Sequence, residues 1–323
     1  MAPSFLITCN RLCVPNLTTD LFKRTLKTGE FAGFLFKLEG LLEDNAVLTK
    51  GGKLSNLHGY GTEHPVWVAI DELAYQRTML NTADSVCILN NGGVGTLNFG
   101  TQLPFLLAAL QPDIIIAPTD HYPWKDSRLK RIRKSTERTQ SYSELTLRAC
   151  VGLETKVCPA ISLHLANGEE EEKSKLVELE MQKRVGSING APLASIHIEQ
   201  DYLYSAQAQS ALYRGMVTPA EVISLTLRGF TIFESSYATH AAEQGKAILI
   251  DDDGLETIFD LSDPLYFDDF SPLSVNCACV ACSGADKTSK SYIHHLIMSR
   301  EMLSSVFLSS HNLAQFARLF YKD

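Results

Sequence analysis

The sequence has no surplus of positive charge and no long hydrophobic run. Its 29 lysine and arginine residues face 37 aspartate and glutamate residues, which gives a formal net charge of -8 at pH 7. A protein that coats nucleic acid by bulk electrostatics needs an excess of cations, so we expect any nucleic-acid contact to be local or shared with a partner. No apolar window reaches the roughly 20 residues of a membrane-spanning helix, so we expect no membrane span.

The sequence also lacks an export signal and is poor in cysteine. Residues 1–17 contain no basic region, and their apolar run is too short for the hydrophobic part of a secretory signal. The eight cysteines therefore favour a reducing, cytoplasmic setting. In such a setting, clustered cysteines bind a metal more often than they form disulfides.

The order of apolar and amphipathic segments predicts an α/β fold. From about residue 64, short β-rich runs alternate with helix-length amphipathic stretches without a long linker. This pattern favours a closed (β/α)8 TIM barrel. A doubly wound sheet is the alternative, but its Gly-x-Gly-x-x-Gly fingerprint is missing, and the glycines of residues 90–95 have the wrong spacing.

Polar residues at the ends of the expected strands are the candidates for chemistry, because barrel enzymes place their sites there. These residues are Asp120, Asn167, Glu199 and Glu234. Each of them also suits the N-cap of the following helix, and for any single one the cap is the simpler interpretation.

Three cysteines, Cys277, Cys279 and Cys282, form a Cys-x-Cys-x-x-Cys cluster. Three thiolates in one loop repel one another or oxidise unless a cation binds them, so we expect a metal and a fourth ligand. Helical spacing carries His311 on an apolar stripe that would face the loop. His294 and His295 are the alternatives. A Cys3His set is a closed, tetrahedral site that suits structural zinc.

The pattern of the chain changes after about residue 263, where a loop leads into these cysteines. No glycine or proline occurs between about Ser289 and Asp323, which predicts one long helix. We therefore expect a TIM-barrel domain over residues 1–262. A zinc-binding subdomain with a long C-terminal helix should follow over residues 263–323.

The cysteine cluster and the segment after it resemble the zinc region of tRNA-guanine transglycosylases. That family has Cys-x-Cys-x-x-Cys, then Tyr-[Ile/Leu]-x-His-Leu, a Glu and a closing His-Asn. The matching residues here are Cys277, Cys279, Cys282, Tyr292, Ile293, His295, Leu296, Glu301, His311 and Asn312. The resemblance extends over about residues 100–320 and implies a TIM barrel, with His311 as the fourth ligand of one structural Zn2+.

The residues that the family uses for catalysis are altered in this chain. Where the family has its nucleophilic Asp, this sequence has Glu234, and the added methylene displaces the carboxylate by about 1 Å or more, which is costly for a positioned nucleophile. The Asp-Ser-Gly-Gly-Phe-Gln motif is missing, and Ala166 replaces the Gln that contacts the incoming base. Asp120 is offset by one residue from the family's base-binding Asp. We therefore expect no catalytic residue here.

Because it lacks these catalytic residues but keeps the zinc region, the chain resembles a non-catalytic branch of the family. This implies a heterodimer with the catalytic subunit that exchanges guanine for queuine in tRNAs with GUN anticodons, and tRNA contact through that complex. It also implies a peripheral association with the mitochondrial outer membrane. The basic residues 125–138 are a solvated helix face in the simpler interpretation, and a contact for tRNA in our hypothesis. A self-sufficient enzyme with Glu234 as nucleophile, or a zinc-stabilised scaffolding homodimer, are the alternatives.

Overall fold

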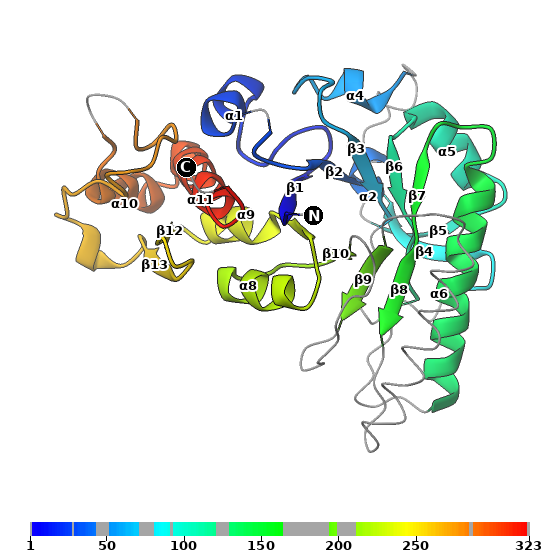
Figure 1. Cartoon of the computed structure of the whole chain (residues 1–323). Coiled ribbons are helices and arrows are strands. Elements are labelled where there is room, and N and C mark those ends of the chain that lie inside the picture. Colours follow the sequence, from blue (N-terminus) through cyan, green and yellow to red (C-terminus); the bar gives the residue numbers. More distant parts are fainter. Residues whose placement is uncertain are drawn as a thin grey trace.

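The computed structural model describes residues 2–27, 29–42, 52–70, 81–90, 93–120, 129–163, 194–198, 211–283 and 287–321. Within them, nine strand segments form one curled sheet in which neighbouring strands run parallel (Figure 1). Its order is β7-β6-β3-β2-β1-β11-β10-β9-β8. The strands are β1 (Ser4–Cys9), β2 (Gly33–Lys37), β3 (Val66–Ala69), β6 (Ile114–Ile116), β7 (Lys156–Cys158), β8 (Ala160–Leu163), β9 (Ala194–Ile198), β10 (Ala211–Tyr213) and β11 (Ile232–Glu234).

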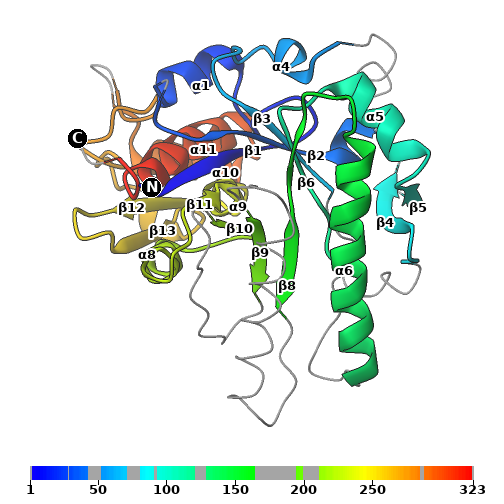
Figure 2. The ribbon, with the colours of Figure 1, turned by 45° about the vertical axis from the view of Figure 1, so that its right-hand side comes forward.

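The first and last members of this order are two halves of one segment. β7 and β8 are separated only by Pro159, which has no N–H to donate to a ladder. β7 pairs with β6 on one side, and β8 pairs with β9 on the other. The sheet therefore closes on itself as a ring of parallel strands, whose curvature is visible in Figure 2, and the predicted TIM barrel is confirmed.

Helices and one hairpin surround the ring. Among the described residues, the helices that precede the last barrel strand are α1 (Thr19–Thr25), α2 (Leu38–Leu42), α4 (Leu54–Leu57), α5 (Gln102–Leu110), α6 (Leu129–Ala149) and α8 (Pro219–Leu227). In chain order, an antiparallel hairpin of β4 (Ser85–Asn90) and β5 (Gly93–Asn98) comes between β3 and α5. α8 begins at Pro219 because Thr218, its N-cap, and Glu221 form a reciprocal capping box, and proline suits the first helical position.

The core has an inner and an outer layer, since successive residues of a strand point to opposite faces. Along β1, Leu6 belongs to a cluster that also takes one or two residues from each of several strands, including Leu35 and Ile116. Its neighbours Phe5 and Ile7 belong to the large cluster that includes residues of the surrounding helices. The near-continuous apolar strands are thus buried on both faces, as in other parallel sheets.

The C-terminal part follows the last barrel strand. It contains α9 (Ser236–Glu243), the antiparallel pair β12 (Lys246–Ile250) and β13 (Glu256–Asp260), a 3-10 turn (Pro264–Tyr266), α10 (Lys290–Met298) and α11 (Met302–Ala317). α11 packs against α9, β12, α10 and α1 (Figure 1). Its end joins the barrel, because Phe316 and Phe320 contact Phe5 of β1. The division at residues 262 and 263 stays a prediction, since α11 contributes to both parts.

The single C-terminal helix expected from the sequence is two helices. Arg300 adopts a left-handed conformation with φ of 55°. The Glu301 N–H donates to the Leu296 carbonyl over 2.8 Å, and the Arg300 N–H donates to the Ile297 carbonyl over 3.0 Å. This is the Schellman pattern that ends a helix, formed here without the usual glycine.

Candidate metal centre and barrel mouth

The three clustered cysteines and His311 meet in the interior. All four side chains are buried, and their ligand atoms lie within 4.8 Å of one another. His311 Nδ1 is 3.3 Å from the Sγ atom of Cys282 and 3.7 Å from that of Cys279. The chain thus brings together the four residues that sequence and resemblance select.

A tight turn brings the sulfur atoms of the spaced cysteines to one point. The N–H groups of Cys282 and Ser283 both donate to the carbonyl of Cys279, over 3.1 and 2.8 Å. This folds the segment back so that Cys279 and Cys282 turn towards the same point. The Val280 N–H then donates to Ser310 Oγ over 3.1 Å, which fastens the loop to α11 beside His311.

The orientation of His311 is set by a backbone carbonyl. Its Nε2 lies 2.9 Å from the Ile248 carbonyl oxygen, which can only accept, so Nε2 carries the proton. The lone pair of Nδ1 therefore faces the sulfur atoms, as in most histidine ligands. The competing histidines are elsewhere: His294 Nδ1 is 2.8 Å from the Leu261 carbonyl oxygen, and His295 is exposed.

Without a cation, the three cysteine thiols do not all lose their protons easily. Hydrogen bonds to Cys277 and Cys282, together with burial, hold the pKa of the Cys279 thiol far above its usual range. The pKa of Cys282 is raised to about 12, mainly by its hydrogen bond to Cys277. Hydrogen bonds from Cys279 and Cys282 lower the pKa of Cys277. The cluster alone therefore stabilises one thiolate, and a cation is needed to stabilise three.

The residues fit a tetrahedral metal. With bonds of about 2.3 Å to sulfur and about 2.05 Å to nitrogen, a tetrahedral ion keeps S and N donors roughly 3.6 Å apart. The two sulfur-to-Nδ1 distances of 3.3 and 3.7 Å bracket that value. The buried Cys3His group is thus suited to a metal ion.

Glu234 lies at the end of β11, where the sequence places the altered nucleophile. It is 3% exposed, and its Oε1 accepts a hydrogen bond over 2.5 Å from Nε of Arg214. Arg214 directly follows β10, the neighbouring strand, and only 16% of its side chain is exposed. The carboxylate is therefore held in a largely buried ion pair within the chain itself.

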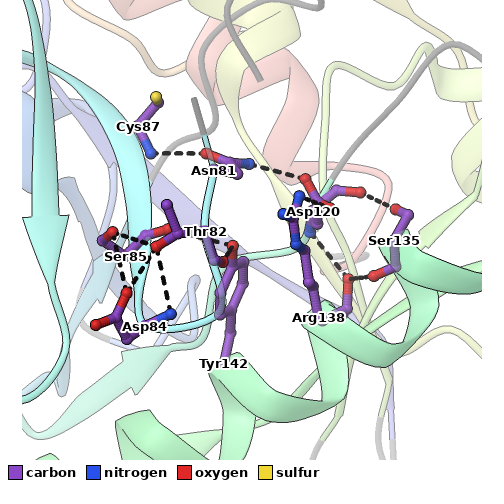
Figure 3. A network of polar contacts seen from close by, with 10 residues as sticks. Asn81, Thr82, Asp84, Ser85, Cys87, Asp120, Ser135, Arg138 and Tyr142 are labelled. Atoms are coloured by element: carbon purple, nitrogen blue, oxygen red, sulfur yellow. Dashed lines mark hydrogen bonds and ion pairs between the residues drawn. The ribbon is translucent and has the colours of Figure 1, made fainter. Parts of the chain in front are cut away.

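Asp120, after β6, is fully buried in a polar network (Figure 3). Its Oδ1 accepts from Asn81 Nδ2 over 2.9 Å, and its Oδ2 lies 3.3 Å from Nη1 of Arg138. The backbone of Asp120 is bound by Ser135 and Thr139 of α6. Asn81 in turn accepts from the N–H of Cys87 over 2.8 Å. Asp120 thus joins β6, α6 and the start of the β4–β5 hairpin.

Arg214 and Arg138 are functional partners that the sequence reasoning missed. Arg214 carried no usable signal, because the sequence analysis expects no strand before it and β10 has only three residues. Arg138 was assigned only to the basic stretch, of which Lys134 is exposed and residues 125–128 lie outside the described residues. Asn167, Glu199 and Ala166 also lie outside the part of the chain that the structure describes.

The model of one protein family, described as queuine tRNA-ribosyltransferase, matches residues 2–322. The chain belongs to this family. A relative from the tick Ixodes scapularis, named queuine tRNA-ribosyltransferase accessory subunit 2, is 24% identical over 348 residues, which cover 97% of this chain and 86% of the relative. The protein of that name from Caenorhabditis briggsae is 22% identical, with 95% and 86% covered.

Other relatives of the same name are matched over less of their length. The protein from Drosophila grimshawi is 26% identical over 258 residues, which cover 72% of this chain and 60% of that relative. The chain thus spans about 60% of the length of this queuine tRNA-ribosyltransferase relative. No helix among the described residues combines the length and the apolar character needed to cross a bilayer.

Proposed function

We propose that this chain is a non-catalytic accessory subunit of a queuine tRNA-ribosyltransferase. It pairs with the catalytic subunit and supports the exchange of guanine for queuine at the wobble position of tRNAs with GUN anticodons, those for Asp, Asn, His and Tyr. The observation that carries this proposal is the ion pair between Glu234 and Arg214. A carboxylate nucleophile must be free to attack the ribose carbon, and Glu234 is buried and bound to a cation of its own chain.

The second carboxylate that such chemistry needs is also engaged. Glycosyl transfer with retention uses a nucleophile and a nearby acid or base. The candidates for that role are Asp120 and Glu199, and Asp120 is fully buried and bound by Asn81 and Arg138. Glu234 and Asp120 therefore act as structural groups at the barrel mouth, which supports a subunit without its own activity.

The Cys3His group holds one structural Zn2+ in this proposal. Four protein ligands complete a tetrahedron and leave no position for a metal-bound water. When bound, the ion would supply stability to the C-terminal part rather than chemistry, because it would tie the loop at 277–283 to α11. Buried thiols that share charge poorly and a histidine lone pair turned towards them support this assignment.

The face presented to the catalytic subunit is the exposed apolar surface of the C-terminal part. Over the described residues from 263 onward, six large apolar side chains are between 63% and 79% exposed. They are Leu265, Phe267, Phe270, Val275, Met298 and Met302. Exposed apolar side chains grouped in one region commonly mark a protein interface. Through such a complex, the basic residues of α6, including exposed Lys134, contact tRNA. The complex acts in the cytoplasm and associates peripherally with the mitochondrial outer membrane.

The test is a base-exchange assay with labelled guanine on a tRNA with a GUN anticodon. The chain is assayed alone and with the catalytic subunit, both as wild type and as Glu234→Gln, which keeps a hydrogen bond to Arg214. We expect activity only in the mixture, unchanged by the substitution. Activity of the chain alone that the substitution abolishes would establish a self-sufficient transglycosylase. A chain that forms homodimers and does not bind the catalytic subunit would be a scaffold instead.

A further inference from the structure

One edge of β12 is bonded to side chains of α11 instead of to another strand. β13 pairs with β12 over Lys246–Ile250. On the opposite side, the N–H groups of Ile248 and Ile250 donate to Asn312 Oδ1 and Gln315 Oε1, over 2.9 and 3.0 Å. The Ile248 carbonyl accepts from His311 Nε2 over 2.9 Å. A single face of α11 thus takes the place of a neighbouring strand.

This arrangement is wholly internal. His311, Asn312 and Gln315 are all 0% exposed. A buried backbone N–H or carbonyl must find a partner inside the protein, because no water replaces it. Gln315 Nε2 has no hydrogen-bond partner among the described residues, so the acceptor Oε1 is the part of this side chain that is used here.

Ile248 connects Asn312 to the metal centre. Its N–H is held by Asn312, and its carbonyl holds the proton-bearing nitrogen of His311. A movement of this residue would turn the imidazole and shift Nδ1 relative to the sulfur atoms of Cys279 and Cys282. The second hydrogen bond of a metal-binding histidine commonly fixes its tautomer and its ring orientation.

Asn312 is also bound on its other side. Its Nδ2 donates to the carbonyl oxygen of Lys246 over 2.9 Å and to that of Ala238 over 3.3 Å. Ala238 lies in α9, four residues after Glu234. The amide therefore joins α11, β12 and the helix that leaves the last barrel strand.

We propose that Asn312 is a positioning residue of the metal centre. It fixes β12, with help from Gln315, so that Ile248 presents its carbonyl to His311 and the imidazole meets the metal at the correct angle. This inference rests on the metal site of the proposed function. It adds that the affinity of that site is determined in part by two amides that do not touch the metal.

The experiment compares metal binding by the full chain and three variants. Metal-free protein is titrated with Co2+, whose visible absorption reports thiolate and imidazole coordination, and with Zn2+ in competition with a chelator. The variants are Asn312→Leu, Gln315→Leu and Ser309→Ala. Ser309 is the matched control, because it is a buried residue of α11 whose hydroxyl accepts from Asn16 rather than binding the backbone of β12.

We expect Asn312→Leu to lower metal affinity by about 10-fold, the lower end of the effect of removing a direct partner of a metal ligand, because Asn312 acts on His311 through Ile248. It should also alter the Co2+ spectrum at saturation, which a general loss of stability would not do. Gln315→Leu should have a smaller effect of the same kind, and it carries the test if Asn312→Leu does not fold. Ser309→Ala should bind as the wild type does.

Wild-type affinity and an unchanged spectrum in the folded variants would overturn this inference while the metal site itself stands. Failure of the wild-type chain to bind either metal would overturn the metal site, and this inference with it.

Discussion

At the scale of single residues, the decisive feature is a charge placed where water cannot reach it. Removing one partner of a buried ion pair leaves the other charge without compensation, which commonly costs about 3–5 kcal/mol. Replacing both partners with apolar groups is often close to neutral. Glu234 and Arg214, at 4% and 16% side-chain exposure, are in this situation.

We therefore expect Arg214→Met to lower the free energy of unfolding by about 3 kcal/mol or more, as measured by urea denaturation. The double variant Arg214→Met with Glu234→Leu should regain most of the loss. Lys53→Met is the control, because its ion pair with Asp113 is 41% and 32% exposed and should contribute less than about 1 kcal/mol. A single variant as stable as the control would contradict the structural role of the pair.

A second residue-scale prediction concerns His58, which is 5% exposed beside Phe34, Phe36 and Tyr60. Its Nδ1 accepts from the Tyr60 N–H over 3.0 Å, and burial lowers its pKa below 6.5. As the pH falls from 6.5 towards the folded-state pKa, the unfolded chain binds a proton that the folded chain does not. Stability from this group is thus complete above pH 6.5 and falls by up to about 1.4 kcal/mol per pH unit below it.

The check is denaturant unfolding between pH 5 and 8 for the wild type and for His58→Gln. The variant should lose stability less steeply below pH 6.5. Parallel curves for the two proteins would show that His58 titrates alike in the folded and unfolded states.

The residue scale also shows where sequence reasoning ends. Cys277, Cys279 and Cys282 were predictable because three ligands lie in one loop. The choice of His311 over its competitors needed the resemblance, since it depends on how α11 packs. Arg214 was missed because its partner lies 20 residues away and meets it only through the pairing of β10 with β11.

At the scale of elements, the C-terminal part is assembled around ligands that must lose protons. Metal binding by thiols releases protons, so affinity depends on pH. The pKa of Cys282 stands at about 12 without a metal, and that of Cys279 is also raised. The metal therefore has to displace protons from at least these two groups at neutral pH.

We expect the apparent Zn2+ affinity to fall by more than tenfold for each unit of pH lowered between 8 and 6, as measured by competition with a chelator of known pH dependence. Two or more protons released per ion would give this slope. Cys13→Ala is a suitable control, because Cys13 is an exposed free cysteine outside the cluster. An affinity independent of pH would contradict thiolate binding.

The starts and ends of helices differ in how well the sequence predicts them. The start of α8 can be read from Thr218 and Pro219, because an N-cap threonine and an N1 proline are local signals. The break between α10 and α11 was not found, because Arg300 adopts a conformation that glycine usually marks. Its cost is offset by tertiary packing of both helices, which a single sequence does not display.

At the scale of the whole molecule, the barrel was predictable because repeated strand and helix patterns leave few topologies. Closure was part of that prediction, but the interruption of one barrel strand at Pro159 was not, since it depends on how β7 and β8 pair with β6 and β9. The partner face that we propose draws on separate segments of the C-terminal part, so it too depends on the folded chain.

We expect Phe267→Asp and Phe270→Asp each to weaken binding to the catalytic subunit by tenfold or more, as measured by analytical ultracentrifugation or calorimetry. Both rings are highly exposed, at 73% and 79%, so folding stability should change little. Aromatic anchors commonly dominate interface energy. The control is Leu227→Asp, an 85% exposed residue on α8. Equal affinities for all three variants would place the interface elsewhere.

The Arg214–Glu234 pair has a consequence for the history of the molecule. A single substitution that removes the charge of either residue leaves the other charge buried without its counterpart and lowers stability. A shorter carboxylate, as in Glu234→Asp, would still lie beside the Arg214 guanidinium. The pair can be replaced without that loss only as a unit, so we expect the residues at positions 214 and 234 to vary together among related chains.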